Sequence, residues 1–126
     1  MRPPRYWPVK FRRSLVLTVV LAFLACRPSA VPEVPAPLEV TTKLGTELAF
    51  DPARVVAPSQ VRVRLVFSNV STLAHNLVLL SPLDGGTRPI VQPGESDVFE
   101  FDTPPPGTYR FVCSIHEDMS GTLESR

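Results

Sequence analysis

Apolar and polar residues alternate with a period of two over much of the chain from about Leu38 onward. This spacing is typical of strands that bury one face and expose the other. Leu77 to Leu80 is instead a continuous apolar run, as expected for a short strand buried on both sides. The predicted buried faces are Val61, Val63, Leu65 and Phe67; Phe99 and Phe101; and Tyr109, Phe111 and Cys113.

Turn-forming residues separate these runs, and no stretch has sustained helical periodicity. The chain has 15 prolines, which disfavour long helices and fix turns between strands. The sequence therefore predicts an all-β fold: an antiparallel Greek-key sandwich or barrel of about seven to eight strands. The clearest turns are Asp51-Pro52, Ala57-Pro58-Ser59, Asp84-Gly85-Gly86, Gln92-Pro93-Gly94 and Pro104-Pro105-Pro106-Gly107.

The first 25 residues are typical of an export signal rather than of a folded domain. Arg12-Arg13 precedes an apolar run from Leu15 to Ala25, which is shorter than the roughly 20 residues that span a bilayer. A basic region, a short apolar run and a small residue before the break are the parts of a signal peptide. We therefore predict a signal peptide at 1–25, a spacer at 26–37 and a folded domain at 38–126. The twin arginines leave open which export route it uses.

Cys26 ends the segment Leu21-Ala22-Phe23-Leu24-Ala25-Cys26, which resembles a bacterial lipobox. The resemblance implies that Cys26 is lipidated and becomes the new N-terminus, although Phe23 stands where such motifs usually have leucine. A plain cleaved signal peptide and an uncleaved short anchor are the alternatives. The proline-rich spacer after Cys26 is expected to be extended and semi-rigid, so that it holds the domain away from a membrane.

The charge of the chain changes once the export signal is set aside. The whole chain has 13 basic and 12 acidic residues, but residues 1–25 contain five of the basic ones and no acidic one. The remainder has eight basic and 12 acidic residues, a net charge of −4. A mildly acidic domain gives no reason to expect nucleic-acid binding.

The candidate chemistry lies in the segment Cys113-Ser114-Ile115-His116-Glu117-Asp118-Met119. A thiolate, an imidazole and a thioether fall within seven residues, at the end of a predicted strand and in the loop after it. These soft and borderline donors suit copper far better than magnesium or calcium. Glu117 and Asp118, between the donors, are expected to be solvated loop acids that bias the choice of partner.

A second imidazole, that of His75, precedes the apolar run Leu77 to Leu80. Two imidazoles and one thiolate in a trigonal set with a long axial methionine form a blue-copper site. Other interpretations stay open at this point. Cys113 could be a buried apolar residue or pair with Cys26 in a disulfide, Met119 could pack in the core, and the same ligands could bind zinc.

The order His-Asn followed much later by Cys-x-x-His-x-x-Met resembles the cupredoxin family, over roughly Leu48 to Leu123. The Cys-to-Met spacing is similar to that of amicyanin. The motifs that carry the resemblance are Phe50-Asp51-Pro52, His75-Asn76-Leu77, Gln92-Pro93-Gly94-Glu95, the run Pro106 to Cys113, and Met119-Ser120-Gly121-Thr122-Leu123.

The resemblance implies a role for each matching residue. His75 and His116 would be nitrogen ligands of one copper ion, Cys113 the thiolate and Met119 the weak axial ligand. Asn76 would tie the two ligand loops together with Ser114 as its partner, and such hydrogen bonding near sulfur raises the reduction potential. The sequence leaves open whether the carbonyl of Ala74 approaches the metal on the side opposite Met119. His116 would lie near the surface, with Leu73 and Ile115 in a docking patch.

The function that follows is a mononuclear blue-copper electron carrier, not an enzyme. It would be a monomer on the extracytoplasmic face of a bacterial membrane, passing single electrons between redox proteins such as a cytochrome and an oxidase. The alternative is a carrier that delivers copper to an oxidase, although Met1 and Met119 are the only methionines. A copper enzyme would need more histidines than the two present.

Overall fold

The structure, a computed structural model, describes Met1 and residues 35–126. The predicted signal peptide, Cys26 and most of the spacer lie outside the described residues, so their assignment stays a prediction. The described residues contain no helix that is long and apolar enough to cross a membrane.

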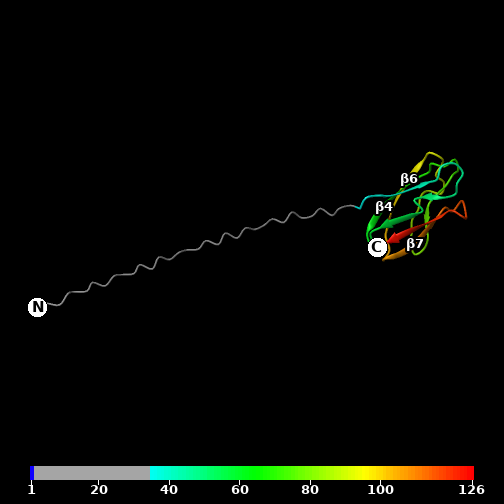
Figure 1. The fold of residues 1–126 in the computed structure, drawn as a ribbon. Helices are drawn as coiled ribbons and strands as arrows, with labels where there is room; N and C mark the ends of the chain where they lie inside the picture. Colours follow the sequence, from blue (N-terminus) through cyan, green and yellow to red (C-terminus); the bar gives the residue numbers. More distant parts are fainter. Residues whose placement is uncertain (2–34) are drawn as a thin grey trace. The chain divides into compact units, whose positions relative to one another are not determined.

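Within residues 35–126, eight strands form two four-stranded sheets, which confirms the predicted all-β sandwich (Figure 1). One sheet has the order β2-β1-β4-β6 and the other β3-β8-β7-β5. The strands are β1 Leu38–Thr42, β2 Phe50–Asp51, β3 Arg54–Ala57, β4 Arg62–Ser68, β5 Val78–Leu79, β6 Ser96–Asp102, β7 Gly107–Val112 and β8 Ser120–Ser125.

The sheets are mixed rather than purely antiparallel. β1 pairs with β4 in parallel, with Leu38 opposite Leu65, and β3 pairs with β8 in parallel, with Arg54 opposite Thr122. The long antiparallel ladders are β4 with β6 and β7 with β8. Parallel neighbours arise because the chain crosses between the sheets, and alternation along one strand does not reveal the direction of its neighbour.

The core lies between the two sheets and follows the predicted alternation closely. Val63, Leu65 and Phe67 of β4 are at most 2% exposed. Val61 precedes β4 and is 36% exposed, so its predicted burial is wrong. The run Leu77 to Leu80 forms only the two-residue strand β5, in which Leu79 is buried and Val78 is half-buried. Tyr109 packs against the core and donates its hydroxyl to the carbonyl of Pro105 at 2.8 Å.

Loops at one end of the sandwich bring the predicted ligands together. β4 runs toward this end and leads into the segment that contains His75, and β7 leads into Cys113. In Figure 1 the orange-red loop before β8 lies at the end of the domain away from the C-terminus. We call the segments 43–51, 69–76, 86–97 and 113–119 the metal end.

Candidate metal centre

His75 is fully buried, and both its backbone amide and its carbonyl form hydrogen bonds with Val91. Its amide donates to the carbonyl of Val91 at 3.1 Å, and the amide of Val91 donates back to its carbonyl at 2.8 Å. This two-bond bridge fixes His75 against a segment 16 positions later in the chain. Because backbone bridges resist rotation, the imidazole projects from a rigid support rather than from a free loop.

The Cys113–Met119 loop closes on itself between β7 and β8. The amide of Cys113 donates to the carbonyl of Met119 at 2.9 Å, and the amide of Met119 donates to the carbonyl of His116 at 3.1 Å. Cys113 and Met119 are 2% and 0% exposed, whereas His116 is half-buried. The loop therefore buries both of its sulfur-containing side chains. His116 lies near the surface, as predicted.

Three of the four predicted ligands converge. The Sγ atom of Cys113 lies 3.8 Å from Nδ1 of His75 and 3.6 Å from Nδ1 of His116. The three donor atoms all lie within 4.8 Å of one another, although His75 is 38 residues before Cys113. Such a set is of the size that one metal ion can bridge. Met119 is buried and its carbonyl accepts the Cys113 amide, so its backbone lies beside the three donors. The axial roles of Met119 and of the Ala74 carbonyl stay predictions.

The surroundings of His75 keep it neutral. Burial, followed by the proximity of His116, lowers the pKa of His75 below its usual 6.5. A neutral imidazole has a free lone pair, which metal binding requires. The lowered pKa thus leaves a lone pair of His75 free for a metal at neutral pH.

Asn76 joins the two ligand loops, as the resemblance implied. Its amide group donates to Oγ of Ser114 at 2.7 Å, and its carbonyl oxygen accepts the Ser114 amide at 2.7 Å. The same amide group also donates to the carbonyl of Pro89 at 3.0 Å. One side chain next to His75 therefore holds the residue next to Cys113 and the segment before Val91.

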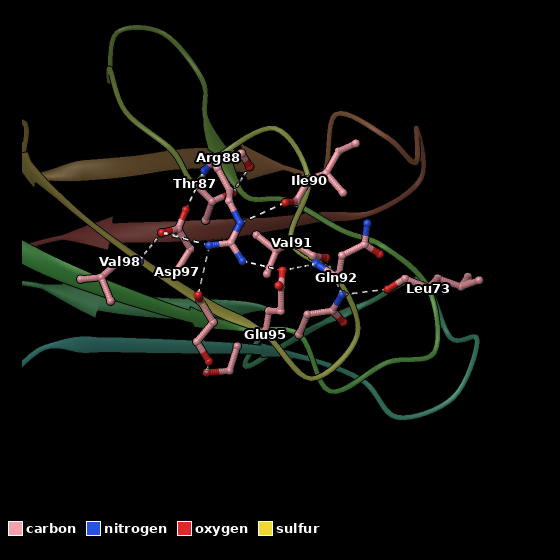
Figure 2. A network of polar contacts seen from close by, with 12 residues as sticks. Leu73, Thr87, Arg88, Ile90, Val91, Gln92, Glu95, Asp97 and Val98 are labelled. Carbon is pink, nitrogen blue, oxygen red and sulfur yellow. Dashed lines mark hydrogen bonds and ion pairs between the residues drawn. The ribbon is translucent and has the colours of Figure 1, made fainter.

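The segment that contains Pro89 and Val91 is braced by ionic contacts that sequence reasoning missed (Figure 2). The Arg88 guanidinium contacts the Glu95 carboxylate at 2.6 Å, and the Arg88 amide donates to the Asp97 carboxylate at 2.7 Å. The Glu95 carboxylate also accepts the Gln92 amide at 2.9 Å. This Gln92 contact, followed by Arg88, lowers the pKa of Glu95. The motif Gln92-Pro93-Gly94-Glu95 signalled a turn but not its partner Arg88.

A second missed group surrounds the far nitrogen of His75. The hydroxyl of Ser71 lies 2.9 Å from Nε2 of His75 and is itself buried. Thr42 and Asn69, both 1% exposed, pack their polar atoms beside it. The polar stretch Ser68 to Thr72 is visible in the sequence, but nothing there indicates that one hydroxyl reaches back to His75.

The donor set fits copper. Two imidazoles and a thiolate form the trigonal set that copper accepts in both oxidation states, and a thioether adds a soft axial donor. Zinc gains little from a thioether and usually takes four close ligands. Cys113 is a free, buried cysteine in the described part of the chain, and Cys26 lies outside that part.

Comparisons with known proteins agree with this geometry. The family model of the cupredoxin-like domain matches residues 15–123, which is more than half of the chain. No curated protein matches significantly. Among solved structures, auracyanin B is 27% identical with a TM-score of 0.61, over 76% of this chain and 93% of that chain.

Two further structures share the fold at lower identity. The reduced auracyanin of Roseiflexus castenholzii is 21% identical with a TM-score of 0.62, covering 74% of this chain and 98% of that chain. Auracyanin A of Chloroflexus aurantiacus, described as a blue copper protein, is 22% identical with a TM-score of 0.62, covering 73% of this chain and 99% of that chain.

Proposed function

The chain belongs to the cupredoxin-like domain family, and from this premise we propose that it is an exported electron-transfer protein. It is a blue copper protein with a single type 1 copper ion. The observation that carries the proposal is the convergence of Cys113 Sγ with one nitrogen of His75 and one of His116. We assign these three as the strong ligands and Met119 as the weak axial one. The bound ion supplies reversible one-electron chemistry.

The residues of the chain contribute rigidity and burial. The Val91 bridge, the Asn76 contacts and the closed Cys113–Met119 loop hold the ligands in place before a metal arrives. A fixed ligand set changes little between oxidation states, so electron transfer needs little reorganisation. Burial of His75, Cys113 and Met119 also disfavours the alternative of a copper carrier, which must release its ion readily.

The half-buried His116 is the proposed point at which electrons leave. Ile115, next to His116, is 43% exposed, and the other segments of the metal end also have exposed apolar side chains. Leu73, the other predicted patch residue, is only half-buried. An apolar surface with a polar rim suits brief docking of another protein. The exposed apolar residues of the metal end are Leu44, Leu48, Val70, Ile90 and Ile115.

The proposed site of action is the extracytoplasmic face of a bacterial membrane. The export signal at 1–25 and the lipobox-like segment before Cys26 support this location. A lipid anchor would keep the protein at the surface where membrane redox complexes work, and tethering raises its local concentration there. Mass spectrometry of the mature protein tests the anchor, because an unmodified Cys26 would contradict it.

The experiment for the copper site uses Cu(II)-loaded protein. We expect an intense visible thiolate-to-copper band and narrow copper hyperfine splitting in the electron-spin-resonance spectrum, both lost in Cys113→Ser. Reversible one-electron voltammetry with slow loss of copper supports the electron carrier. A protein with only weak copper absorption would show that the ligands do not bind a type 1 ion, and rapid transfer of Cu(I) to a chelator would favour the carrier.

A further inference from the structure

The Ser71 hydroxyl has three polar neighbours, which use its full hydrogen-bonding capacity. Its Oγ atom lies 2.9 Å from the Leu73 amide, 3.1 Å from the Leu73 carbonyl and 2.9 Å from Nε2 of His75. A hydroxyl donates one hydrogen bond and accepts two. Ser71 is 3% exposed, so water does not compete for these contacts.

The direction of each bond follows from what each neighbour can do. The Leu73 amide can only donate and the Leu73 carbonyl can only accept, so in the inferred arrangement Ser71 donates its proton to that carbonyl. The remaining lone pair of Ser71 must then accept a proton from Nε2 of His75. Since a neutral imidazole has one N–H, Nδ1 keeps the free lone pair. Nδ1 is the nitrogen that faces Cys113.

Ser71 is in turn fixed by β1. The Thr42 hydroxyl accepts the amides of Val70 and Ser71, both at 2.9 Å, and donates to the Asn69 side-chain oxygen at 3.1 Å. The Asn69 amide group donates to the carbonyls of Leu73 and Val91, both at 2.8 Å. Every buried side-chain nitrogen and oxygen in the described part of the chain has a partner.

We propose that Ser71, supported by Thr42 and Asn69, is a positioning residue for the copper site. It accepts the Nε2 proton of His75 and thereby fixes the ring's tautomer and rotation with Nδ1 directed toward the metal. An acceptor on the far nitrogen also makes a ligating imidazole more basic. A more basic nitrogen stabilises Cu(II) more than Cu(I), because Cu(I) favours sulfur. The proposal rests on the proposed function only in naming copper as the ion.

The first test needs neither a metal nor a substitution. Nitrogen-15 NMR of the metal-free protein above pH 7 reports which nitrogen of His75 carries the proton. We expect the proton on Nε2, with a coupling or slowed exchange that shows its hydrogen bond. A dominant Nδ1–H form would overturn the proposal, whether or not the protein proves to bind copper.

The second test compares Ser71→Ala with Ser68→Ala. Ser68 also has a hydroxyl partner, Ser96 at 2.9 Å, but that pair contacts no ligand. Loss of such a ligand-supporting contact usually costs about 10–100-fold in metal affinity. We expect this loss for Cu(II) in Ser71→Ala, a smaller loss for Cu(I), and a second population of the Nδ1–H tautomer. Each tenfold difference between the two affinities raises the reduction potential by about 59 mV.

Rescue separates positioning from general destabilisation. Ser71→Thr keeps a hydroxyl at the same place and is expected to retain the tautomer and the potential of the wild type. A Ser71→Ala protein whose tautomer and potential equal those of Ser68→Ala would overturn the proposal, as would a Ser71→Thr protein that behaves like Ser71→Ala. If Ser71→Ala does not fold, the proposal is still tested by the His75 tautomer of the wild type and by the tautomer and reduction potential of Ser71→Thr.

Discussion

Asn76 illustrates at the scale of one residue how the two ligand loops depend on each other. Its side chain is 2% exposed and makes three hydrogen bonds, two with Ser114 and one with Pro89. Buried amide groups that lose their partners are costly, while each satisfied bond contributes about 0.5–1.5 kcal/mol. The stability of the metal end should therefore respond to Asn76 independently of any metal.

Replacing Asn76 by leucine removes all three bonds and leaves the Ser114 amide without its acceptor. We expect the unfolding free energy of the metal-free protein to fall by about 2–4 kcal/mol. Urea denaturation followed by far-ultraviolet circular dichroism measures it. Ser114→Ala is the control, because it keeps the contact with Pro89 and should cost only about 1 kcal/mol. Equal losses in the two variants would show that the loops are not coupled through Asn76.

The ligands were readable from the sequence for a chemical reason. Copper needs thiolate and imidazole, and the chain offers two histidines and two cysteines, so few combinations were possible. Ser71 was not readable, since serine serves turns, caps and surfaces equally well. Its role depends on a fold that brings its hydroxyl within 2.9 Å of a ring four residues later. Residue identity thus predicts the donors but not the groups that orient them.

At the scale of the element, the segment 87–95 supports the site without contributing a ligand. Arg88, Glu95 and Asp97 hold its ends through hydrogen bonds and ion pairs (Figure 2). Val91, in its middle, forms backbone hydrogen bonds with His75. Because the Glu95 carboxylate is stabilised by the Gln92 amide and then by Arg88, its pKa lies below the usual value. Its charged form is therefore favoured in the folded state.

This lowered pKa predicts a pH dependence with a definite sign. The stabilisation from Glu95 is fully present above its unfolded pKa of about 4.5 and is lost as pH falls through its lower folded pKa. Wild type should exceed Glu95→Gln in urea midpoint at pH 6, and the difference should shrink steadily below pH 4.5. Glu100→Gln is the control, since Glu100 pairs with Arg62 far from this segment. A difference that is constant from pH 6 to pH 3 would contradict the assignment.

The sequence predicted the buried faces of the strands better than it predicted their ends and their pairing. The alternation in β4 gave its buried face correctly at Val63, Leu65 and Phe67, because one-sided burial imposes a period of two. The alternation also placed Val61 on the buried face, but β4 begins only at Arg62. It also could not give the parallel pairing of β1 with β4. Partner and direction depend on crossings between the sheets, which leave no local pattern.

At the scale of the molecule, the metal end and the chain's point of attachment lie at opposite ends of the domain. β1 begins at Leu38 beside Leu65 and runs parallel to β4 toward the metal end. The C-terminal strand ends at Ser125, opposite Gly107 and away from the Cys113–Met119 loop (Figure 1). The first strand of the domain and its last residues therefore lie away from the surface around His116.

The net charge of the domain is also divided unevenly between its ends. The metal end contains six acidic and two basic residues, a net charge of −4, whereas the rest of residues 38–126 contains five of each. Its acidic residues are Glu47, Asp51, Glu95, Asp97, Glu117 and Asp118, and its basic residues are Lys43 and Arg88. A redox partner with a basic surface around its own cofactor is thus favoured at this end.

This uneven charge predicts how salt changes electron transfer. Oxidation of the Cu(I) protein by a cationic cobalt(III) complex should slow roughly tenfold between 10 and 150 mM salt, and oxidation by anionic hexacyanoferrate(III) should accelerate. Glu117→Lys with Asp118→Lys brings the metal end to neutrality and should abolish both trends. The control, Glu39→Lys with Asp84→Lys, changes the total charge equally but outside the metal end, so it should leave most of each trend intact. If both double variants respond alike, total charge rather than its location governs the encounter, and a basic partner at this end loses its support.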